Sequence, residues 1–393
     1  MNHYRILTLN QISAHGLSRF PSARYTVGKA VDAPDAIVLR SFDLHSTPIA
    51  PSVKAIGRAG AGTNNIPVAE MSQRGVPVFN APGANANAVA ELVLAAMLLG
   101  ARNVVPAIHY VAGLDPQAAD LDARVEDGKK QFAGFELPGR TLGVIGLGAI
   151  GSLVADTAIK LGMKVIGFDP EITVDAAWRL PSSVRRANSI EEVLKGSDFV
   201  TLHVPLVKMT RHLIDARRLA VAKHGAVLLN FARDEIVDDA AVVEALRAHR
   251  LKSYLCDFPS ATLLAERNVV ALPHLGASTA EAEENCAVMV VDQVREFLDH
   301  GTVRNAVNFP NVEMPRESPH RVAIANANVP NMLGQISSAM AKAGLNIHNM
   351  VNKSRGDMAY TLVDVDSPVA DDVTRTLASI HGVLSVRAIP AEG

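Results

Sequence analysis

Three glycines and one aspartate form the part of this sequence best suited to binding a dinucleotide. Gly146-x-Gly148-x-x-Gly151 follows an apolar run typical of a strand and precedes an amphipathic stretch typical of a helix. The first two glycines permit a tight turn and close ligand approach, the third lets the helix pack on the strand, and the N–H groups of the first helical turn suit a pyrophosphate. Asp169 ends the next strand, 18 residues after the last glycine, where a ribose hydroxyl is expected.

The charge of Asp169 also indicates which nicotinamide cofactor binds. A carboxylate there repels a 2′-phosphate, and the following Pro170 and Glu171 provide no arginine to offset that repulsion. The sequence therefore predicts NAD rather than NADP. The alternative left open is a glycine-rich turn that binds no ligand.

Two further side chains could act on a substrate beside that cofactor. Oxidation of an alcohol needs a group that takes the hydroxyl proton, and an imidazole such as that of His274 ordinarily titrates near working pH. Arg233 carries a permanent charge in a planar fork, which suits gripping a carboxylate and polarising a carbonyl. Taken singly, each could be structural, as a buried histidine and a surface cation. Both follow predicted strands that end at one edge of a sheet, which favours the catalytic interpretation.

A second glycine-rich stretch suits an anionic substrate group. Gly57-Arg58-Ala59-Gly60-Ala61-Gly62 puts an arginine and several open backbone amides after a predicted strand. A glycine-rich connection with a solvated arginine is the alternative.

The elements that position these residues alternate between strands and helices. We expect a doubly wound parallel sheet whose ligands lie at the carboxyl ends of six strands, at about 141–145, 164–168, 198–203, 226–230, 253–257 and 269–272. Before it, a small parallel α/β domain is predicted, with strands at 5–9, 36–39, 53–56 and 76–79. Apolar periodicity predicts helices at 88–99 and 280–300, and the polar segment 115–130 is expected to be an exposed connection.

The C-terminal region has the pattern of a separate module. Residues 309–320 contain three prolines and little apolar content, which is typical of a linker. Residues 321–389 then follow the order strand, helix, strand, strand, helix, strand. This order predicts a ferredoxin-like βαββαβ fold.

Composition narrows the classes of partner and compartment. A chain of 393 residues suggests two or three domains, and a formal net charge of −2 gives no electrostatic case for nucleic acid or an anionic membrane. No apolar run reaches the length of about 18 residues that a membrane span requires. Cys256 and Cys286 lie in apolar segments and the histidines lack metal-ligand spacing, so we expect a reducing, cytoplasmic setting and no metal.

Together, the motifs GLGAIG with Asp169, HVPL, NFAR and PHLGAST, with GRAGAG before them and the βαββαβ tail behind, resemble the D-isomer-specific 2-hydroxyacid dehydrogenases, in a compact form with a C-terminal ACT domain. The resemblance covers essentially the whole chain. It implies a Rossmann-type nucleotide domain inserted in a flavodoxin-like substrate domain, followed by an ACT regulatory domain. The implied bounds are 1–97 with 279–312 for the substrate domain, 98–278 for the NAD-binding domain, 313–319 for the linker and 320–393 for the ACT domain.

The resemblance also implies an activity and its residues. The expected reaction is NAD-dependent oxidation of a phosphorylated 2-hydroxy acid, 3-phospho-D-glycerate, to 3-phosphohydroxypyruvate, the first step of L-serine biosynthesis. The alternatives are another D-2-hydroxy acid as substrate, or an NAD-sensing protein without catalysis. Arg233 would polarise the carbonyl, His274 would be the acid/base, Arg58 would meet the phosphate, and the amides of Ala59, Gly60 and Ala61 would hold the carboxylate. Further positions implied to contact NAD are Ala149, Ile150, Val204, Pro205, Phe231, Ala232, Arg233, Asp257, His274 and Gly276.

Two positions depart from the family pattern. The family usually has a Glu a few residues after the Asp257 position, which pairs with the catalytic histidine; here residues 259–263 contain no acid, and Glu266 is the nearest carboxylate. Asp234 stands where a Gly is usual. An unpaired imidazole is expected to be a weaker base and to shift the pH optimum.

The ACT-like tail resembles modules that bind an amino acid between paired domains. The resemblance places Asn326, Asn328 and Asn346 where such modules hydrogen-bond the effector, although one type of enzyme has a His at the first position. Serine is the expected effector, and pairing of these modules implies a homo-oligomer, either a dimer or a tetramer. Alternatively, these asparagines only satisfy backbone groups in loops.

Overall fold

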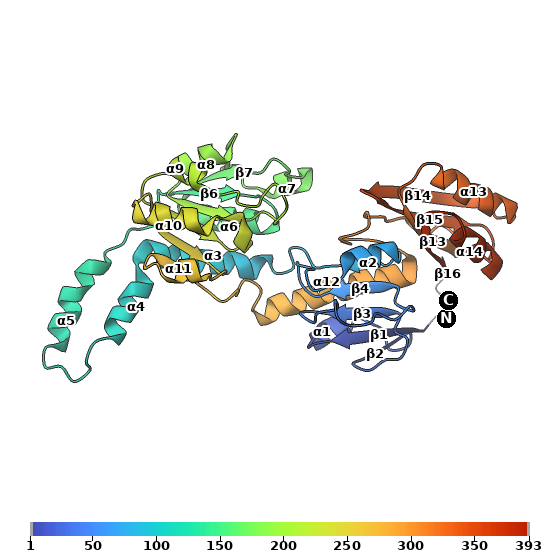
Figure 1. Ribbon diagram of the computed structural model, residues 1–393, viewed down its shortest axis with the longest axis horizontal. Coiled ribbons are helices and arrows are strands. Elements are labelled where there is room, and N and C mark those ends of the chain that lie inside the picture. The colour runs from blue at the N-terminus through green and yellow to red at the C-terminus, as the bar shows by residue number, and fades with distance from the viewer. Residues whose placement is uncertain (1–2, 391–393) are drawn as a thin grey trace. The chain divides into compact units, whose positions relative to one another are not determined.

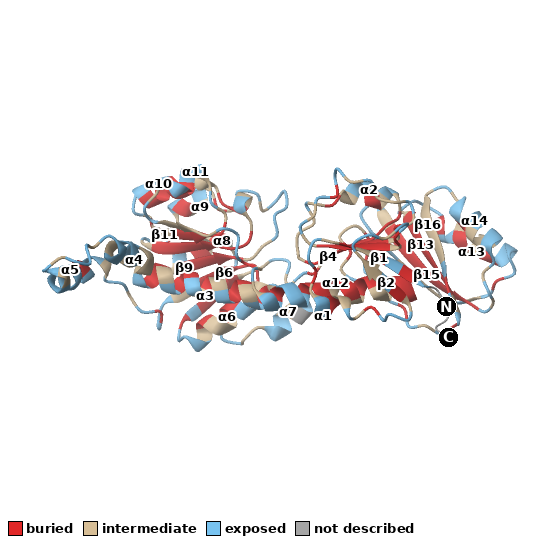
Figure 2. Ribbon diagram, turned by 90° about the horizontal axis from the view of Figure 1, so that it is seen from below, coloured by how far each residue is buried: buried red, intermediate tan, exposed pale blue. Residues whose placement is uncertain are grey.

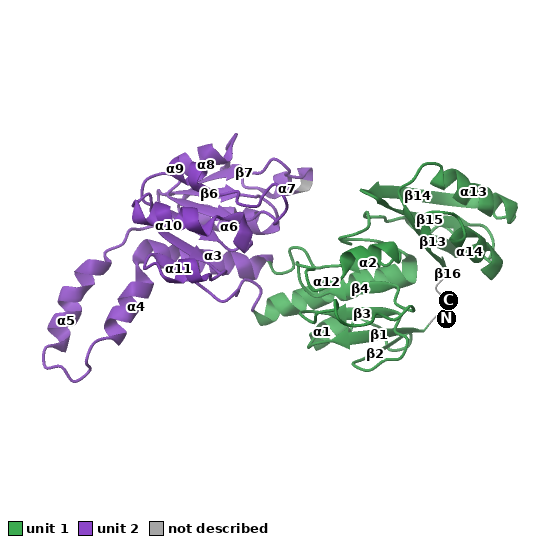
Figure 3. Cartoon of the chain, viewed as in Figure 1, with its two compact units in different colours: residues 1–85, 279–393 green, residues 86–278 purple. Residues whose placement is uncertain are grey.

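The computed structural model describes residues 3–390 and forms two compact units, Met1–Asn85 with Thr279–Gly393, and Ala86–Ser278 (Figures 1 and 3). We call them the first and the second unit. Among the described residues no single helix is long and apolar enough to cross a membrane. Helices α3 (Ala86–Arg102) and α4 (Val104–Ala112), bent by 68° at their junction, pass that test only as a pair, by length and composition.

The first unit contains a five-stranded parallel sheet in the order β2-β1-β3-β4-β5. Its strands are β1 (Tyr4–Leu9), β2 (Tyr25–Gly28), β3 (Ala36–Leu39), β4 (Ala55–Arg58) and β5 (Val78–Phe79). This order is the flavodoxin-like one, so that prediction is confirmed. Strand β2 was not predicted, and the strand predicted at 53–56 runs two residues later, which makes Arg58 its last residue.

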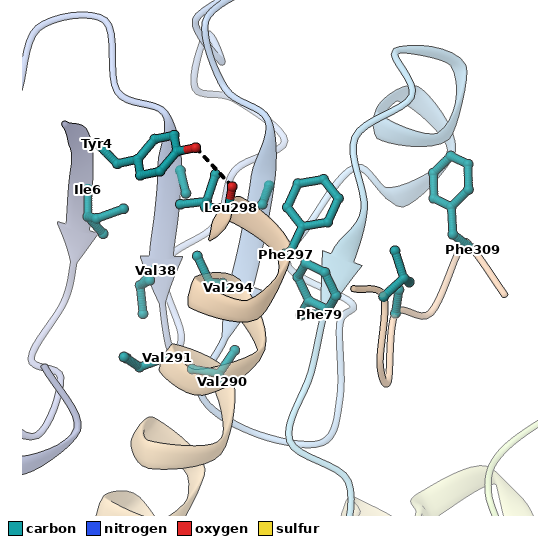
Figure 4. Packing of buried hydrophobic residues seen from close by; sticks show 14 of the residues in the cluster. Tyr4, Ile6, Val38, Phe79, Val290, Val291, Val294, Phe297, Leu298 and Phe309 are labelled. Carbon is teal, nitrogen blue, oxygen red and sulfur yellow. Dashed lines mark hydrogen bonds between the residues drawn. The ribbon is translucent and has the colours of Figure 1, made fainter. Parts of the chain in front are cut away.

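Helix α12 (Ala280–His300) supplies most of the core on one face of this sheet, and the short helices α1 (Ala14–Leu17) and α2 (Val68–Gln73) complete this part of the unit. Val290, Val291 and Val294 are fully buried among the strands, and the Tyr4 hydroxyl donates to the carbonyl of Leu298 at 2.9 Å (Figure 4). The predicted helix at 280–300 is confirmed. It begins after the Thr279 cap and ends at Gly301, whose φ of +74° suits glycine.

The tail is an antiparallel sheet in the order β14-β15-β13-β16, which is the ferredoxin-like topology expected from the sequence. Its elements are β13 (His320–Ala327), α13 (Met332–Lys342), β14 (Ile347–Arg355), β15 (Met358–Val365), α14 (Asp371–Ala378) and β16 (Val383–Ile389). Tyr360 and Leu362 share a hydrophobic cluster with α12. The buried Arg321 pairs with Asp364 at 2.7 Å and also donates to the carbonyl of His300, so the tail and α12 share one core.

The second unit contains a seven-stranded parallel sheet in the order β12-β11-β10-β9-β6-β7-β8. Its strands are β6 (Thr141–Ile145), β7 (Lys164–Phe168), β8 (Arg185–Arg186), β9 (Phe199–Leu202), β10 (Ala226–Asn230), β11 (Leu251–Cys256) and β12 (Val269–Ala271). The order from β8 to β12 is that of a Rossmann fold, which confirms the predicted class. The prediction of six strands was one short, because β8 consists of two exposed arginines and has no apolar pattern.

Helices cover both faces of this sheet. Its strands are therefore largely buried, and they appear red in Figure 2. The helical segments besides α3 and α4 are α5 (Leu121–Gly128), η1 (Lys129–Phe132), α6 (Ala149–Lys160), α7 (Val174–Arg179), α8 (Ile190–Gly196), α9 (Ala216–Ala220), η2 (Asp234–Ile236), α10 (Asp239–Arg247) and α11 (Ala261–Leu264). The domain boundary expected at residue 97 falls inside α3, whereas the units divide before it. Residues 115–130, predicted to be an exposed connection, are mostly exposed but also contain α5, which the sequence did not predict. Helices α4 and α5 form a projecting helical hairpin, which we call the arm (Figure 1).

Candidate functional site

The turn after β6 requires two of its three glycines for internal packing. A Cβ on Gly146 would lie 2.4 Å from the carbonyl oxygen of His203, and a Cβ on Gly151 would lie 1.9 Å from the carbonyl oxygen of Gly146. Gly146 also has a φ of +91°. A Cβ on Gly148 would meet no atom within 4 Å. The space beside the backbone is therefore open to a ligand at Gly148, whereas protein atoms fill it at Gly146 and Gly151.

The first turn of α6 is uncapped. No side chain accepts a hydrogen bond at its N-cap, Gly148, and both Gly148 and Ala149 are exposed, while Ile150 is half-buried. The first N–H groups of a helix have no acceptor within the helix, so they attract an anion, and the helix dipole adds to that attraction. This end of α6 can hold a pyrophosphate without any cationic side chain.

Backbone amides hold Asp169 at the end of β7. Its Oδ2 accepts from the N–H of Leu147 at 2.8 Å and its Oδ1 accepts from the N–H of Glu171 at 3.0 Å. The half-buried carboxylate is thus tied to the glycine turn, with lone pairs left to accept from ribose hydroxyls. This geometry fits an unphosphorylated ribose.

The ends of β9 and β10 place the next predicted residues. Val204 is half-buried and Pro205 is exposed after β9, while Phe231 and Ala232 are buried after β10. The side chain of Asn230, which is fully buried, holds this second turn, because its Nδ2 donates to the carbonyl of Arg233 at 2.8 Å and its Oδ1 accepts from the N–H of Ala232 at 3.2 Å. Asn230 is a positioning residue, which the sequence analysis noted only as the first residue of the NFAR motif at a strand end.

Arg233 follows directly and is half-buried. Its Nη1 donates to the carbonyl of Ala232 at 2.5 Å, which folds the guanidinium back over its own turn. A half-buried guanidinium held in this way presents a fixed, permanently charged donor to a carboxylate or a carbonyl oxygen.

Asp257, His274 and Gly276 meet after β11 and β12. The N–H of Gly276 donates to Asp257 Oδ2 at 3.2 Å, and the N–H of His274 donates to the carbonyl of Asp257 at 3.0 Å. Burial raises the pKa of the Asp257 carboxyl, and the charges of His274 and Arg233 partly oppose that rise. The side chains of Asp257, His274 and Arg233 are therefore close enough to interact electrostatically.

One oxygen of Asp257 is left for a ligand. The residue is 1% exposed, and its Oδ1 has no hydrogen-bond partner among the described residues. A buried acceptor without a partner is costly, and the amide N–H₂ of a nicotinamide would supply the missing donor. Together with the open face at Gly148 and the tethered Asp169, this atom fits NAD.

The acid that the family pairs with its histidine is absent here. Glu266 is bound instead to the guanidinium of Arg247 at 2.5 Å and is only 16% exposed. Within residues 3–390, no carboxylate forms an ion pair with His274, which is itself exposed.

The first unit carries the predicted anion site at the end of β4. Gly60 leaves room there for the guanidinium, because a Cβ on it would lie 2.1 Å from Arg58 Nη1. Ala59 is buried, and Gly60 and Ala61 are half-buried. Arg58 Nε donates at 3.0 Å to the carbonyl of Arg40, which follows the adjacent β3 and whose own guanidinium is paired with Glu283 at 2.5 Å. The sequence analysis missed Arg40, because only the β3–β4 register reveals that the two arginines are neighbours.

The three asparagines of the tail differ in their surroundings. Asn326 is 1% exposed; its Nδ2 donates to the carbonyl of Ala327 and its Oδ1 has no described partner. Asn328 is exposed and its Nδ2 donates to the carbonyl of Gly356 at 3.0 Å, while Asn346 is exposed and its N–H donates to a carboxylate. The buried acceptor of Asn326 is the feature most suited to a ligand.

Metal binding has no support in the part of the chain that the structure describes. No group of three or more His, Cys, Asp or Glu side chains there could hold an ion. Burial lowers the pKa of His203 to about 3, so this histidine stays neutral and binds Thr201 at 3.0 Å.

Comparison with known proteins bears on these sites. Residues 104–276 match the family model described as D-isomer specific 2-hydroxyacid dehydrogenase, NAD binding domain. The chain is 35% identical over 356 residues to D-3-phosphoglycerate dehydrogenase of Haemophilus influenzae, covering 86% of this chain and 82% of that protein. It is 38% identical over 287 residues to the protein of that name in Methanocaldococcus jannaschii, covering 71% of this chain and 52% of the relative, so it spans about half of that protein's length.

Comparison with solved structures also finds a protein named 3-phosphoglycerate dehydrogenase. The NAD⁺-bound 3-phosphoglycerate dehydrogenase of Entamoeba histolytica is 26% identical to this chain, with a TM-score of 0.61 over 78% of this chain and 98% of that chain.

Proposed function

This chain belongs to the D-isomer-specific 2-hydroxyacid dehydrogenases, and from that premise we propose that it oxidises 3-phospho-D-glycerate to 3-phosphohydroxypyruvate with NAD, the first step of L-serine biosynthesis. The observation that carries the proposal is the cluster at the carboxyl edge of the Rossmann sheet, where the backbone N–H groups of His274 and Gly276 both donate to the buried Asp257 and Arg233 follows the adjacent strand β10. The identity of the substrate is inferred from relatives that are named D-3-phosphoglycerate dehydrogenase.

Each group of NAD would be held by a different part of the second unit. The first-turn amides of α6 would hold the pyrophosphate, Asp169 would hold the ribose, and Asp257 Oδ1 would hold the carboxamide. When bound, NAD accepts the hydride from the carbon that carries the hydroxyl group. His274 accepts the hydroxyl proton, and Arg233 holds the substrate carboxylate and stabilises the oxygen that becomes a carbonyl. Arg58 binds the phosphate, and the amides of Ala59, Gly60 and Ala61 bind the carboxylate.

The test is NADH formation by the purified protein with NAD and 3-phospho-D-glycerate. His274→Ala is expected to lower kcat about 10²- to 10⁴-fold, because it removes the proton acceptor. Turnover of D-lactate or D-glycerate alone would move the assignment to another hydroxy acid. NAD binding without any turnover would instead favour a sensor that has lost catalysis, for which the absent acid beside His274 is the specific observation.

The arm supports a homo-oligomer. Ile108 and Val111 on α4 are 59% and 56% exposed, and Val125 on α5 is also exposed. Clustered exposed apolar side chains favour a protein partner, and a second copy of the chain would cover them symmetrically. Ile108→Glu should convert the oligomer to a monomer in sedimentation experiments, and an unchanged mass would contradict this.

The tail is proposed to bind serine through Asn326, Asn328 and Asn346. The unpartnered Oδ1 of Asn326 supports this, because the ammonium group of an amino acid would supply its donor. Calorimetric titration that shows no heat with millimolar serine would contradict it. The cytoplasm is the proposed compartment, since Cys256 and Cys286 are both free and buried.

A further inference from the structure

The imidazole of His274 has no hydrogen-bonding side chain beside it among the described residues, and its backbone adopts an unusual conformation. Its φ is +51°, in the left-handed region that non-glycine residues rarely adopt, and its N–H donates to the carbonyls of both Asp257 and Leu272. These bonds fix the backbone but not the ring. Within the part of the chain that the structure describes, no side chain forms a hydrogen bond with the imidazole.

The ring of Phe258 packs against the imidazole. Its centroid lies 5.0 Å from that of His274, and the two planes meet at 61° in an edge-to-face arrangement. Aromatic pairs favour this geometry because the positive edge of one ring meets the negative face of the other. The contact restricts the rotation of an otherwise exposed imidazole.

The backbone of Phe258 is restrained on both sides of its Cα. It is half-buried, and it precedes Pro259, which restricts its backbone to extended conformations. Its carbonyl accepts from the thiol of the buried Cys256 at 3.7 Å. A Phe side chain has only two rotatable bonds, which keeps its number of rotamers small.

The nearby carboxylates are engaged elsewhere. Glu266 is paired with Arg247, and Asp257 Oδ2 accepts from the N–H of Gly276. We propose that Phe258 is a positioning residue that holds the His274 imidazole in its catalytic orientation through this edge-to-face contact. The inference rests on the proposed function, in which His274 accepts the substrate proton.

The test compares Phe258→Leu with Phe258→Tyr. Leu keeps the apolar volume but lacks the ring, so it should lower kcat about 3- to 10-fold and leave KM for NAD and substrate unchanged. Tyr keeps the ring and should restore kcat. Phe135→Leu is the matched control, because it removes a ring pair with Phe199 at 5.8 Å in the same unit and should leave kcat unchanged.

A readout independent of turnover is the NMR signal of the His274 ring protons, identified by its loss in His274→Gln. The Phe258 ring should displace this signal, and Phe258→Leu should return it to the position of a free histidine. Wild-type kcat in Phe258→Leu, a loss that Tyr does not restore, or an unmoved NMR signal would each overturn the proposal. If the wild-type protein does not turn over, the proposed function fails, and the NMR signal alone decides whether Phe258 holds the ring.

Discussion

The glycine-rich turn after β6 and the one after β4 both follow a parallel strand, but they present different groups to a ligand. In the second unit, Gly148 leaves open space over an uncapped helix end, and the recognising groups are backbone amides. In the first unit, Gly60 makes room for the guanidinium of Arg58, with Arg40 on the adjacent strand. The turn after β6 therefore recognises an anion by the shape of its backbone, and the turn after β4 recognises one by side-chain charge. A substitution that adds bulk should impair the turn after β6, whereas one that removes charge should impair the turn after β4.

The largest expected effect comes from adding a methyl group to the turn of the second unit. In Gly151→Ala the new Cβ would lie 1.9 Å from the carbonyl oxygen of Gly146, a backbone atom that cannot move aside. We expect a loss of about 3 kcal/mol or more in the free energy of unfolding, measured by denaturant titration. The matched control is Gly148→Ala, for which no atom lies within 4 Å. Equal stability losses in both variants would contradict the account of the turn.

Removing charge in the first unit should act on the substrate instead. Arg58→Met keeps the length of the side chain, so the fold and NAD affinity should be retained. We expect kcat/KM for 3-phospho-D-glycerate to fall about 10- to 100-fold, the value of one or two charge-assisted hydrogen bonds. Arg40→Met is expected to have a smaller effect in the same direction. A larger effect on NAD affinity than on the phosphorylated substrate would reverse the roles assigned to the two turns.

Asp257 provides a prediction in which stability and binding change in opposite directions. Because burial raises its pKa, the folded chain keeps a proton that the unfolded chain releases above about pH 3.9. Stability is therefore lost as the pH rises through the raised pKa, and Asp257→Asn escapes this loss. At neutral pH the variant should therefore melt at a higher temperature than wild type, yet bind NAD more weakly.

Melting curves from acid to neutral pH check this sign. The advantage of Asp257→Asn should vanish at the acid end, where wild-type Asp257 is protonated in both states. An advantage that is constant with pH would show that the carboxyl carries no burial penalty.

The smallest effect is expected for Gly148→Ala, which should change the free energy of unfolding by less than about 1 kcal/mol. NAD affinity should nevertheless fall about tenfold, because the Cβ occupies the space that the pyrophosphate needs. Trp178, the single tryptophan, lies on α7 after the Asp169 strand, and energy transfer from it to NADH provides the binding signal. Unchanged affinity would mean that the cofactor does not approach the backbone at this residue.

The same contrast explains what the sequence could and could not predict. Shape recognition leaves a local pattern, so Gly146, Gly151 and Asp169 were identified from spacing alone. Arg40 could not be identified in that way, because its proximity to Arg58 depends on strand register. The two exposed arginines of β8 carry no apolar signal, so that strand was missed.

Tertiary contacts account for the other gaps. The linker and tail were expected to be separate, yet Tyr360 lies in the cluster around α12 and its hydroxyl donates to the carbonyl of Gly301 at 2.9 Å. The left-handed backbone of His274 likewise has no sequence signature, because non-glycine residues adopt it only where their surroundings impose it. The class of each fold followed from periodicity, whereas these contacts required the folded chain.

The most direct test of the account is the ratio of kcat/KM for 3-phospho-D-glycerate to that for D-glycerate, measured by NADH formation in wild type and in Arg58→Met. We predict a wild-type ratio well above one that falls about 10- to 100-fold in the variant, with D-glycerate turnover nearly unchanged. A wild-type ratio near one, or a variant that loses both activities equally, would contradict the assignment of the first unit's glycine turn to a phosphorylated substrate.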